Sequence, residues 1–376
     1  MLFLSVRKIR ATMKIAAIDC DLFFIPLPEV MSDSTHGQIE FFSHITVRVR
    51  DQDGMVGTGY TYTVGKTGGP AILSLLEQDV VPLLVDENPN EIERLWEKMW
   101  WGLHYVGRGG IAAFAISAVD IALWDLQSQR ASQPLWMFLG GSDPHVEAYA
   151  GGIDLQWPLE RLLAQTETHL AEGFRAIKMK VGRDELTEDV QRVAAMRTLL
   201  GPDIPLMVDA NMRWSVEQAI EAARELARYD VFWLEEPTLP EDFAGHRRIL
   251  DAGGVPIASG ENLRSVSEFR QLIEAGGASY PEPDVSNIGG ITAWLQVARL
   301  AADAQLPVTS HGVHDLHVHL LAAVPNASYL EVHGFSLKPY LRHQLTMHGG
   351  RAVAPQRPGH GVEFDWDLLG QYRVGD

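Results

Sequence analysis

Apolar and polar residues alternate along the first part of the chain, as they do in half-buried β-strands. Residues 14–63 carry this pattern, most clearly over 45–50. The polar segment 51–54, which ends in glycine, predicts the turn of a β-hairpin. The polar segment 29–40 interrupts the alternation, and we expect it to be irregular.

Helical periodicity then replaces the alternation. Apolar residues recur three and four positions apart, the spacing of one helix face, in the ranges 70–85, 89–101 and 109–131. Strands followed by helices predict an α+β domain over residues 1–140. Because the strand-like alternation begins only at Lys14, we expect Met13 to be the natural start.

Short apolar runs alternate with amphipathic helical stretches from about residue 145 onward. The eight runs are 146–150, 174–181, 205–209, 232–235, 256–260, 280–285, 307–311 and 329–332. Eight strands that alternate with helices are typical of a (β/α)₈ barrel. An open doubly wound sheet is disfavoured because no Gly-x-Gly-x-x-Gly motif opens the first unit. We therefore predict an α/β fold, with a (β/α)₈-type barrel over 141–334 and a C-terminal segment, 335–376, that completes the N-terminal capping domain.

The composition narrows the class of protein. The 376 residues are 46% apolar, enough for a large core. A net charge of −18 repels nucleic acid and anionic membranes, so neither is expected as a partner. The single cysteine, Cys20, excludes an internal disulfide and a Cys-x-x-Cys zinc site. No run of 18 apolar residues occurs, and we expect a soluble, cytoplasmic protein.

Polar residues stand where the apolar runs of the barrel end. Successive ends are 20 to 29 residues apart, about one βα unit. The set comprises Lys178, Lys180, Asp209, Asn211, Glu235, Glu261, Asp284, His311 and Glu331. The carboxyl ends of barrel strands form one ring, where barrel active sites lie, so we expect these side chains to converge.

Three of these residues are carboxylates from consecutive runs: Asp209, Glu235 and Glu261. Three convergent carboxylates in an apolar setting cannot all remain ionised without a cation. Hard oxygen ligands with room for water and substrate suit Mg²⁺. We therefore predict a magnesium site.

Two groups are candidates for proton transfer. Lys178 and Lys180 lie on one face of a strand, and two neighbouring ammonium groups lower each other's pKa, which favours a lysine base. His311 and Asp284 end adjacent runs, and a carboxylate bonded to an imidazole fixes its tautomer and raises its basicity. The lysines and the histidine approach the barrel axis from opposite sides.

A zinc site is an alternative interpretation of the histidines that follow His311. His314 and His317 can share a helical face, but His319 cannot join both. No closed set of ligands is visible, so helix packing or pocket lining is the favoured interpretation.

The chain resembles the mandelate racemase group of the enolase superfamily from about residue 14 to its end. The motifs are GFRAIKMK at 173–180, VDAN at 208–211, WLEEP at 233–237, GEN at 260–262, PD at 283–284, IGG at 288–290, SH at 310–311 and YLE at 329–331. Each is weak alone, but their order and spacing make the set specific. The resemblance implies a capping domain, a modified barrel, Mg²⁺ on the three carboxylates and abstraction of the proton α to a carboxylate.

The resemblance also implies roles for the proton carriers. Lys178 would steady the substrate carboxylate, and Lys180 would be one base. His311, backed by Asp284, would be the opposing acid or base. An enediolate intermediate bears two negative charges, which a metal and a cationic lysine would stabilise.

The remaining candidates would contact the substrate. By the same resemblance Glu331, protonated, would donate a hydrogen bond to the substrate carboxylate, and Asn211 would contact a hydroxyl or order the metal ligands. His36, Lys66 and Arg108 lie in loops of the capping domain and are predicted to set specificity. The first of these loops is rich in hydrogen-bonding groups, whereas an aromatic substrate would favour an apolar loop.

These loops look most like those of talarate and galactarate dehydratases. We therefore expect a Mg²⁺-dependent lyase that eliminates water from a sugar acid or diacid to give a 2-keto-3-deoxy acid. A racemase or epimerase of a 2-hydroxy acid is the alternative, because the ring residues are the same in both reactions. A barrel that only binds a ligand is a remote third possibility. A homo-oligomer is also expected.

Overall fold

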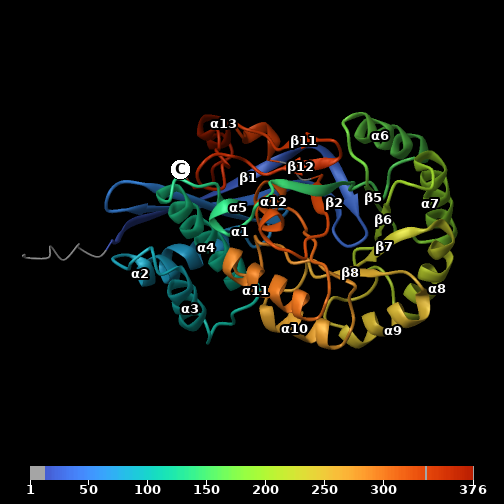
Figure 1. Cartoon of the computed structure of the whole chain (residues 1–376), viewed down its shortest axis with the longest axis horizontal. Helices are drawn as coiled ribbons and strands as arrows, with labels where there is room; N and C mark the ends of the chain where they lie inside the picture. Colours follow the sequence, from blue (N-terminus) through green and yellow to red (C-terminus); the bar gives the residue numbers. More distant parts are fainter. Residues whose placement is uncertain (1–12, 335–336, 376) are drawn as a thin grey trace, which may run out of the picture.

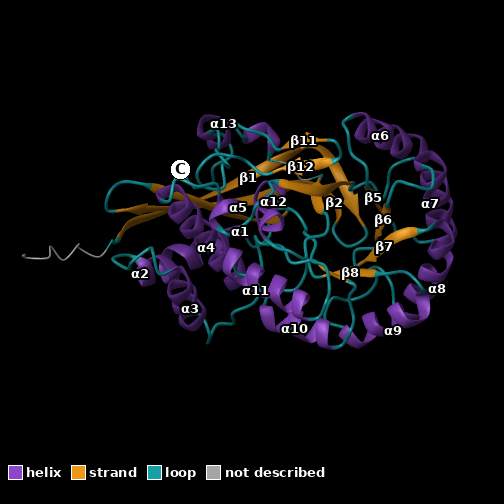
Figure 2. Ribbon diagram, viewed as in Figure 1, coloured by secondary structure: helices purple, strands orange, loops and turns teal. Residues whose placement is uncertain are grey.

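The computed structural model describes residues 13–334 and 337–375, and it consists of two parts (Figure 1). The N-terminal part is an antiparallel sheet with helices against it, and the second is a ring of parallel strands with helices outside (Figure 2). The predicted capping domain and (β/α)₈-type barrel are confirmed. The prediction of Met13 as the natural start concerns residues 1–12, which lie outside the described residues.

The sheet of the capping domain is one meander of long strands. Its strands are β1 (Ile15–Asp33), β2 (Gly37–Asp51) and β3 (Val56–Val64), paired in that order. The turn predicted at 51–54 is present, with Gly54 at φ 87°. The prediction that 29–40 is irregular is confirmed only in part: the register shifts between Pro26 and Met31, but pairing resumes at Met31 with Ile39 and continues to the turn. Strand pairing uses backbone groups and needs no apolar face, so the polar tip remains a hairpin.

Helices cover one face of this sheet. They are α1 (Gly69–Leu75), a π-helical turn (Leu76–Val80), α2 (Val81–Leu84), α3 (Ile92–Gly102), α4 (Ile111–Arg130) and α5 (Leu135–Phe138). The three predicted helical ranges are confirmed, although the first is interrupted by the π-turn. Helix α4 lies close against β3 because Gly57 and Gly59 have no Cβ; a Cβ at either position would collide with the α4 backbone. Among the described residues α4 is also the one helix long and apolar enough to cross a membrane, but 78% of its apolar window is buried in the core.

The barrel begins with β4 and proceeds by strand–helix units. Its strands are β4 (His145–Gly151), β5 (Ile177–Lys180), β6 (Leu206–Asp209), β7 (Val231–Glu235), β8 (Ile257–Ser259), β9 (Tyr280–Pro281) and β10 (Leu330–His333). The helices between them are α6 (Leu159–Ala171), α7 (Leu186–Leu200), α8 (Val216–Leu226), α9 (Phe243–Gly253), α10 (Val266–Glu274), α11 (Gly290–Asp303) and α12 (His314–Ala323). Adjacent strands from β4 to β9 pair in parallel, and β10 pairs with β4 to close the ring.

The run 307–311 holds the position of the remaining strand without forming regular strand pairing. Thr309 N–H donates to the carbonyl of Pro281 in β9, and Val308 forms an isolated bridge to Ala327. The prediction of a full strand here was wrong. The segment is nevertheless held between its neighbours, so His311 still emerges at the mouth of the barrel.

The C-terminal segment contacts both parts of the molecule. Its elements are a 3₁₀ turn (Lys338–Tyr340), β11 (Thr346–His348), β12 (Arg351–Val353) and α13 (Trp366–Gly370). β12 pairs with β4 of the barrel. Tyr372 and Val374 form backbone hydrogen bonds to β1 of the capping domain, through Phe24 and Leu22. The segment thus returns to the capping domain, after adding a hairpin to the barrel. The exact domain boundaries at 140 and 334 stay a prediction.

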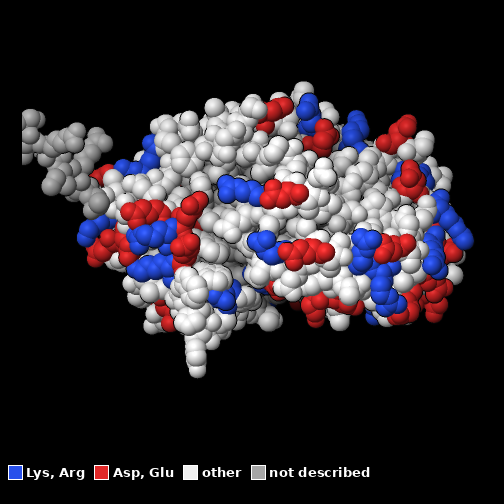
Figure 3. Space-filling view, turned by 60° about the horizontal axis from the view of Figure 1, so that its bottom comes forward, with Lys and Arg blue, Asp and Glu red and all other residues white. Residues whose placement is uncertain are grey.

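The surface carries charges of both signs. On the face drawn in Figure 3, blue and red side chains lie next to one another in several groups, which are separated by white areas. Ion pairs between exposed residues are consistent with this mixture, for example Arg247–Asp251 and Arg248–Glu217.

Candidate active site

Strand register brings the polar residues of the barrel together. Lys180 in β5 pairs with Asp209 in β6, and Asp209 pairs with Glu235 in β7. Glu261 follows β8 by two residues, after a turn in which Gly260 has φ 144°. A side chain at position 260 would collide with the ring of Phe269, so the glycine lets the turn carry Glu261 to the mouth.

The three predicted metal ligands form one cluster. Single oxygen atoms of Asp209, Glu235 and Glu261 all lie within 4.8 Å of one another. Asp209 and Glu235 are fully buried, and Glu261 is 8% exposed. Buried hard oxygen donors at this separation fit a divalent cation such as Mg²⁺.

Two lysines from β5 face this cluster. Lys178 Nζ lies 2.5 Å from Glu235 Oε1 and 3.6 Å from Asp209 Oδ2. Lys180 Nζ forms an ion pair with Asp209 Oδ2. Burial favours the neutral amines, but the surrounding carboxylates outweigh it and raise the pKa of both lysines. The Lys178 ammonium does lower the pKa of Lys180, as expected, but the carboxylates outnumber the lysines and the net shift is a rise. In return, the two lysines overcome the burial of Asp209 and lower its pKa to about 2.

Glu331 in β10 completes the site on the side of Lys178. Its Oε1 lies 2.7 Å from Lys178 Nζ, and its Oε2 accepts the N–H of Gly312 at 2.9 Å. Although burial alone would raise the pKa of Glu331, the Lys178 ammonium lowers it well below its usual value. The expectation of a protonated Glu331 was therefore wrong, because an ammonium group pairs directly with the carboxylate.

His311 lies on the opposite side of the cluster from the lysines. Its Nδ1 is 3.0 Å from Asp284 Oδ2, and its Nε2 is 3.0 Å from Glu261 Oε2. Burial would lower the pKa of His311, but Glu261 and Asp284 outweigh it and raise the pKa well above its usual value. The pairing expected between His311 and Asp284 is present.

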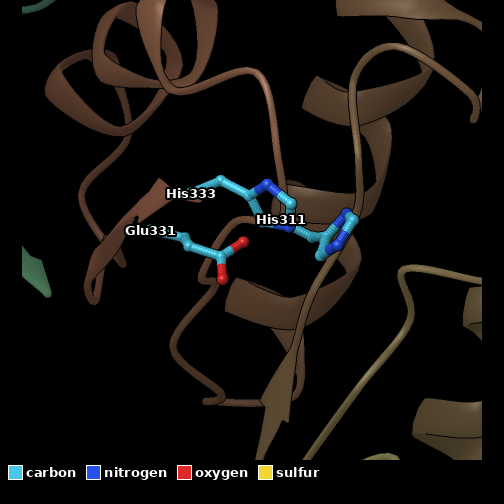
Figure 4. Close-up of side chains that lie close together, drawn as sticks. All are labelled: His311, Glu331 and His333. Carbon is cyan, nitrogen blue, oxygen red and sulfur yellow. The ribbon is translucent and has the colours of Figure 1, made fainter. Parts of the chain in front are cut away.

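His333, which the sequence analysis did not single out, lies beside His311 and Glu331 (Figure 4). The His311 and His333 rings are 5.1 Å apart, close to perpendicular. Ligand atoms of these three residues also lie within 4.8 Å of one another. This group offers one carboxylate and two imidazoles, whereas Asp209, Glu235 and Glu261 offer three anionic oxygen donors, so it is a weaker candidate for a Mg²⁺ site. The spacing of Glu331 and His333, two apart on one strand, is the signal that could have identified it.

Glu282 is a second residue that the sequence analysis missed. It is fully buried, and within the described residues neither of its carboxylate oxygens has a hydrogen-bond partner. Burial, and then the charge of Glu235, raise the pKa of Glu282 well above its usual value. Burial and the neighbouring carboxylate therefore favour the neutral form of Glu282, and the charge of Lys178 opposes this. Its spacing is the signal that could have identified it. Glu282 stands two residues before Asp284, so the two side chains are expected on the same face of the chain.

Asn211 lies at the entrance, in the turn after β6. Its backbone N–H donates to Asp209 Oδ1 at 2.8 Å, and its φ of 43° is in the left-handed region, which asparagine tolerates. Its side-chain Oδ1 is buried without a partner in the described part of the chain. An acceptor in this position can receive a hydroxyl group or a water molecule.

The hairpin tip of the capping domain reaches this entrance. Ser34 Oγ donates to the carbonyl of Ala210 at 2.8 Å, and Thr35 Oγ1 donates to the carbonyl of Asn211. His36 Nδ1 lies 2.9 Å from Asp33 Oδ2. The hydrogen bond that His36 donates to Asp33 is the main cause that raises the pKa of His36, and the charges of Glu261 and Lys180 also act on it. The tip therefore places His36 near the carboxylate cluster.

The structure does not bring Lys66 or Arg108 to this cluster. Lys66 Nζ lies 4.4 Å from the ring centre of Phe41, and the guanidinium of Arg108 lies 3.4 Å from that of Trp100. In the described ranges their contacts are with aromatic rings, which attract cations through their electron-rich faces. These contacts orient the two side chains, and their predicted part in substrate specificity stays a prediction.

The histidines of α12 bind backbone groups. His317 Nε2 accepts the N–H of Val285 at 3.0 Å, and His319 Nδ1 accepts the N–H of Trp136 at 3.3 Å. They fix the helix against the barrel and the capping domain.

Comparison with known proteins gives relatives over nearly the whole chain. A 3,6-anhydro-alpha-L-galactonate cycloisomerase from Streptomyces coelicolor is 52% identical, covering 96% of this chain and all of the relative. L-talarate/galactarate dehydratase from Salmonella typhimurium is 35% identical, covering 93% of this chain and 88% of the relative.

Solved structures resemble this one closely. A racemase from Streptomyces coelicolor with bound magnesium has a TM-score of 0.93 and 52% identity, covering 96% of this chain and all of that one. L-talarate dehydratase from Polaromonas, complexed with Mg and L-glucarate, has a TM-score of 0.92 and 32% identity, covering 97% of this chain and 98% of that one.

Two family descriptions match the chain. Residues 18–140 match the N-terminal domain of the mandelate racemase / muconate lactonizing enzyme family, and residues 161–368 match the enolase C-terminal domain-like family. The chain therefore belongs to the mandelate racemase / muconate lactonizing enzyme family of the enolase superfamily.

Proposed function

We propose that this chain uses Mg²⁺ to abstract the proton α to the carboxylate of an acid sugar and then eliminates the oxygen on the next carbon, giving a 2-keto-3-deoxy acid. One observation carries the proposal. Lys180 and His311 contact opposite members of a single carboxylate cluster, Asp209 and Glu261. A substrate carbon above that cluster has a proton carrier on each face.

The metal would be held by Asp209, Glu235 and Glu261. The buried oxygen cluster fits this ion, and two of the solved relatives contain magnesium. When bound, Mg²⁺ supplies positive charge that offsets the charge developing on the substrate carboxylate as its α proton leaves.

Lys178 and Lys180 divide two tasks. Lys178 lies between Glu235 and Glu331, so its ammonium is fixed as a permanent cation for the substrate carboxylate. Lys180 is paired with Asp209 alone among the carboxylates within 4 Å in the described ranges. When Asp209 shares its charge with a cation, its hold on Lys180 weakens, and the pKa of Lys180 falls toward the range of a base.

His311 serves the other face. Asp284 holds its Nδ1, so Nε2 is the nitrogen that gives or takes the proton. Glu261 lies next to that nitrogen, and a cation held by Glu261 would weaken this contact and leave Nε2 free for the substrate.

The group that leaves distinguishes two versions of the elimination. In a linear acid sugar a hydroxyl leaves as water, as the names of the 35% identical dehydratase and of the L-talarate dehydratase indicate for those proteins. In a 3,6-anhydro sugar acid the oxygen on the third carbon is part of an ether ring, and the same elimination opens the ring without loss of atoms. The 52% identical cycloisomerase favours this second version.

Racemisation is the other candidate, because a solved relative of 52% identity is described as a racemase. It needs the same two proton carriers but no departure of an oxygen.

The test is incubation of the Mg²⁺-loaded protein in D₂O with galactarate, L-talarate and 3,6-anhydro-L-galactonate. Mass spectrometry and NMR then separate three results. A keto acid lighter by one water supports a dehydratase, and a keto acid of unchanged composition supports a cycloisomerase. Deuterium at the α carbon without a keto acid supports a racemase. No product and no exchange with any substrate, or equal activity in Lys180→Ala and His311→Ala, would refute the proposal.

We infer a small sugar acid as the partner and a cytoplasmic location, and we expect a homo-oligomer. Light scattering of the purified protein tests the oligomeric state.

A further inference from the structure

The hairpin tip between β1 and β2 holds a second histidine–carboxylate pair at the mouth of the barrel. Asp33 Oδ1 accepts the backbone N–H groups of Thr35, at 2.8 Å, and of His36, at 2.6 Å. Its other oxygen, Oδ2, lies 2.9 Å from His36 Nδ1. One buried carboxylate thus shapes the turn and fixes the imidazole.

The tip is attached to the loop that carries a metal ligand. Ser34 and Thr35 donate to the carbonyls of Ala210 and Asn211, directly after Asp209. Ser32 forms a parallel bridge to Asp154 in the loop after β4. These contacts hold His36 over the barrel mouth.

His36 has one nitrogen engaged, whereas His311 has two. Both nitrogens of His311 face carboxylates, those of Asp284 and Glu261. For His36, Nδ1 faces Asp33, and Nε2 makes no hydrogen bond within the described residues. The side chain is 43% exposed, so solvent can return a proton to it.

The charges around His36 favour its cationic form. The hydrogen bond to Asp33 raises its pKa, burial opposes this, and the charges of Asp33 and Glu261 raise it further. Lys180 acts in the other direction. The net effect is a raised pKa, which favours the cationic acid form of His36.

The proposed elimination needs an acid at a defined place. Hydroxide and alkoxide are poor leaving groups, and a positioned acid typically contributes about 10²- to 10⁴-fold. In the proposed reaction the substrate carboxylate would face the metal cluster and Lys178. The third carbon would then be one bond beyond the reacting carbon, and the oxygen on it would point toward the hairpin tip, which is held at the barrel mouth by Ser34 and Thr35.

We propose that His36, held by Asp33, is the general acid that protonates the departing oxygen; this rests on the proposed elimination. As the enediolate collapses, the bond between the second and third carbons becomes double and the bond from the third carbon to oxygen breaks. The proton on His36 Nε2 moves to that oxygen, giving water from a linear sugar acid or a free hydroxyl from an anhydro ring. The enol product then becomes the keto acid as a proton adds at the third carbon and the enol hydroxyl releases its proton. The base returns the abstracted α proton to solvent, and neutral His36 regains a proton from solvent.

His36→Gln separates the two halves of the reaction. The variant and wild type are incubated in D₂O with the substrate, galactarate or 3,6-anhydro-L-galactonate, that wild type eliminates. Keto-acid formation should fall about 100-fold or more, whereas deuterium incorporation at the α carbon of recovered substrate should stay within about threefold of wild type. A 3-deoxy-3-fluoro analogue, whose fluoride leaves without a proton, should restore elimination by the variant.

Asp33→Asn provides an independent measurement. Asparagine keeps the Oδ1 acceptor for the turn but lacks the charge that raises the pKa of His36. Because the acid form is needed, elimination declines as pH rises through this pKa, and the decline should move to lower pH in the variant. The control is His145→Gln, which removes a histidine of similar geometry, 2.6 Å from Asp143 at the start of β4. The His145→Gln variant should match wild type in the rate of keto-acid formation and in the rate of deuterium incorporation.

The outcomes distinguish the two proposals. If wild type gives neither exchange nor a keto acid, the proposed function fails. If wild type exchanges without elimination, both the elimination and the role of His36 fail. If wild type eliminates but His36→Gln loses exchange and elimination equally, is not rescued by fluoride, or matches wild type, only the assignment of His36 is overturned.

Discussion

Asp154 Oδ1 accepts the backbone N–H of Lys180 at 3.0 Å, in the place where a strand neighbour would otherwise bind. Arg192 of α7 donates to the Lys180 carbonyl at 2.9 Å and to the Asp154 carbonyl at 3.1 Å. All three residues are buried. The backbone of the proposed base is thus fixed on both sides by one buried ion pair.

Asp154→Ala should therefore impair both stability and turnover. It leaves the Lys180 N–H unpaired and removes one of the two carboxylates that face Arg192, the other being Asp189, so the free energy of unfolding should fall by about 3–5 kcal/mol. Displacement of the base should lower kcat by about 10²-fold with little change in KM. Asp154→Asn, which keeps an acceptor oxygen, should recover most of kcat. If both variants lose kcat equally while remaining folded, charge rather than position is responsible.

Removal of the metal should abolish both exchange and elimination. Conversely, Mg²⁺ should raise the melting temperature, since a ligand at a hundredfold excess over its Kd stabilises the folded state by about 2.7 kcal/mol. Glu261→Gln should weaken this shift, because a neutral amide binds Mg²⁺ poorly. Asp184→Asn, at an exposed ion pair with Arg213, is the matched control and should behave as wild type. A full Mg²⁺ shift in Glu261→Gln would contradict the assigned site.

His44 should make the capping domain sensitive to acid. Its ring is fully buried among aromatic rings, and neither nitrogen has a hydrogen-bond partner within the described residues. The neighbouring rings belong to Phe23, Phe42, Tyr60 and Phe364. Burial lowers the pKa of His44 to about 3. The unfolded chain takes up the proton near pH 6.5, whereas the folded chain does not. The contribution of His44 to the free energy of unfolding is therefore constant above that pH and is lost as the pH falls toward 3.

Between pH 7 and pH 5, His44 alone should lower the free energy of unfolding by about 2 kcal/mol. His44→Phe should remove that part of the acid sensitivity, as measured by urea unfolding at both pH values. His145→Gln, at a half-exposed position, should retain the wild-type difference. An unchanged difference in His44→Phe would mean that the ring has a partner when folded.

Arg108→Ala and Lys66→Ala should leave kcat/KM within about threefold of wild type, because surface substitutions away from a site have small effects. Their cations lie over Trp100 and Phe41 rather than at the carboxylate cluster. Steady-state kinetics on the preferred acid sugar measure this. A loss of tenfold or more in either variant would restore its predicted place in the substrate site.

The barrel could be predicted because its residues obey a repeating rule. Apolar runs of a parallel sheet are buried on both faces, and the polar residue at each end faces the same mouth. Asp209 and Glu235 meet through neighbouring register, which spacing alone anticipates. Most of the candidate site follows from that repetition.

The corrected features depend on contacts between distant segments. Glu331 is charged because Lys178 lies beside it, and no local pattern encodes that pairing. The strand content of 29–40 depends on pairing across the hairpin, and the orientation of Arg108 depends on Trp100. Glu282 was passed over because a buried acid without partners contradicts the usual preference of carboxylates for water.

The backbone bonds of Tyr372 and Val374 to β1 have a practical consequence. That strand runs from these contacts to Asp33 and so carries His36 at its far end. Trimming the chain before residue 372 would strip one edge of β1 and leave Phe24 N–H and the Leu22 carbonyl unsatisfied. A C-terminal purification tag is therefore better attached through a flexible spacer. The last residues can then still form their backbone hydrogen bonds to β1, the strand that leads to the hairpin tip at the barrel mouth.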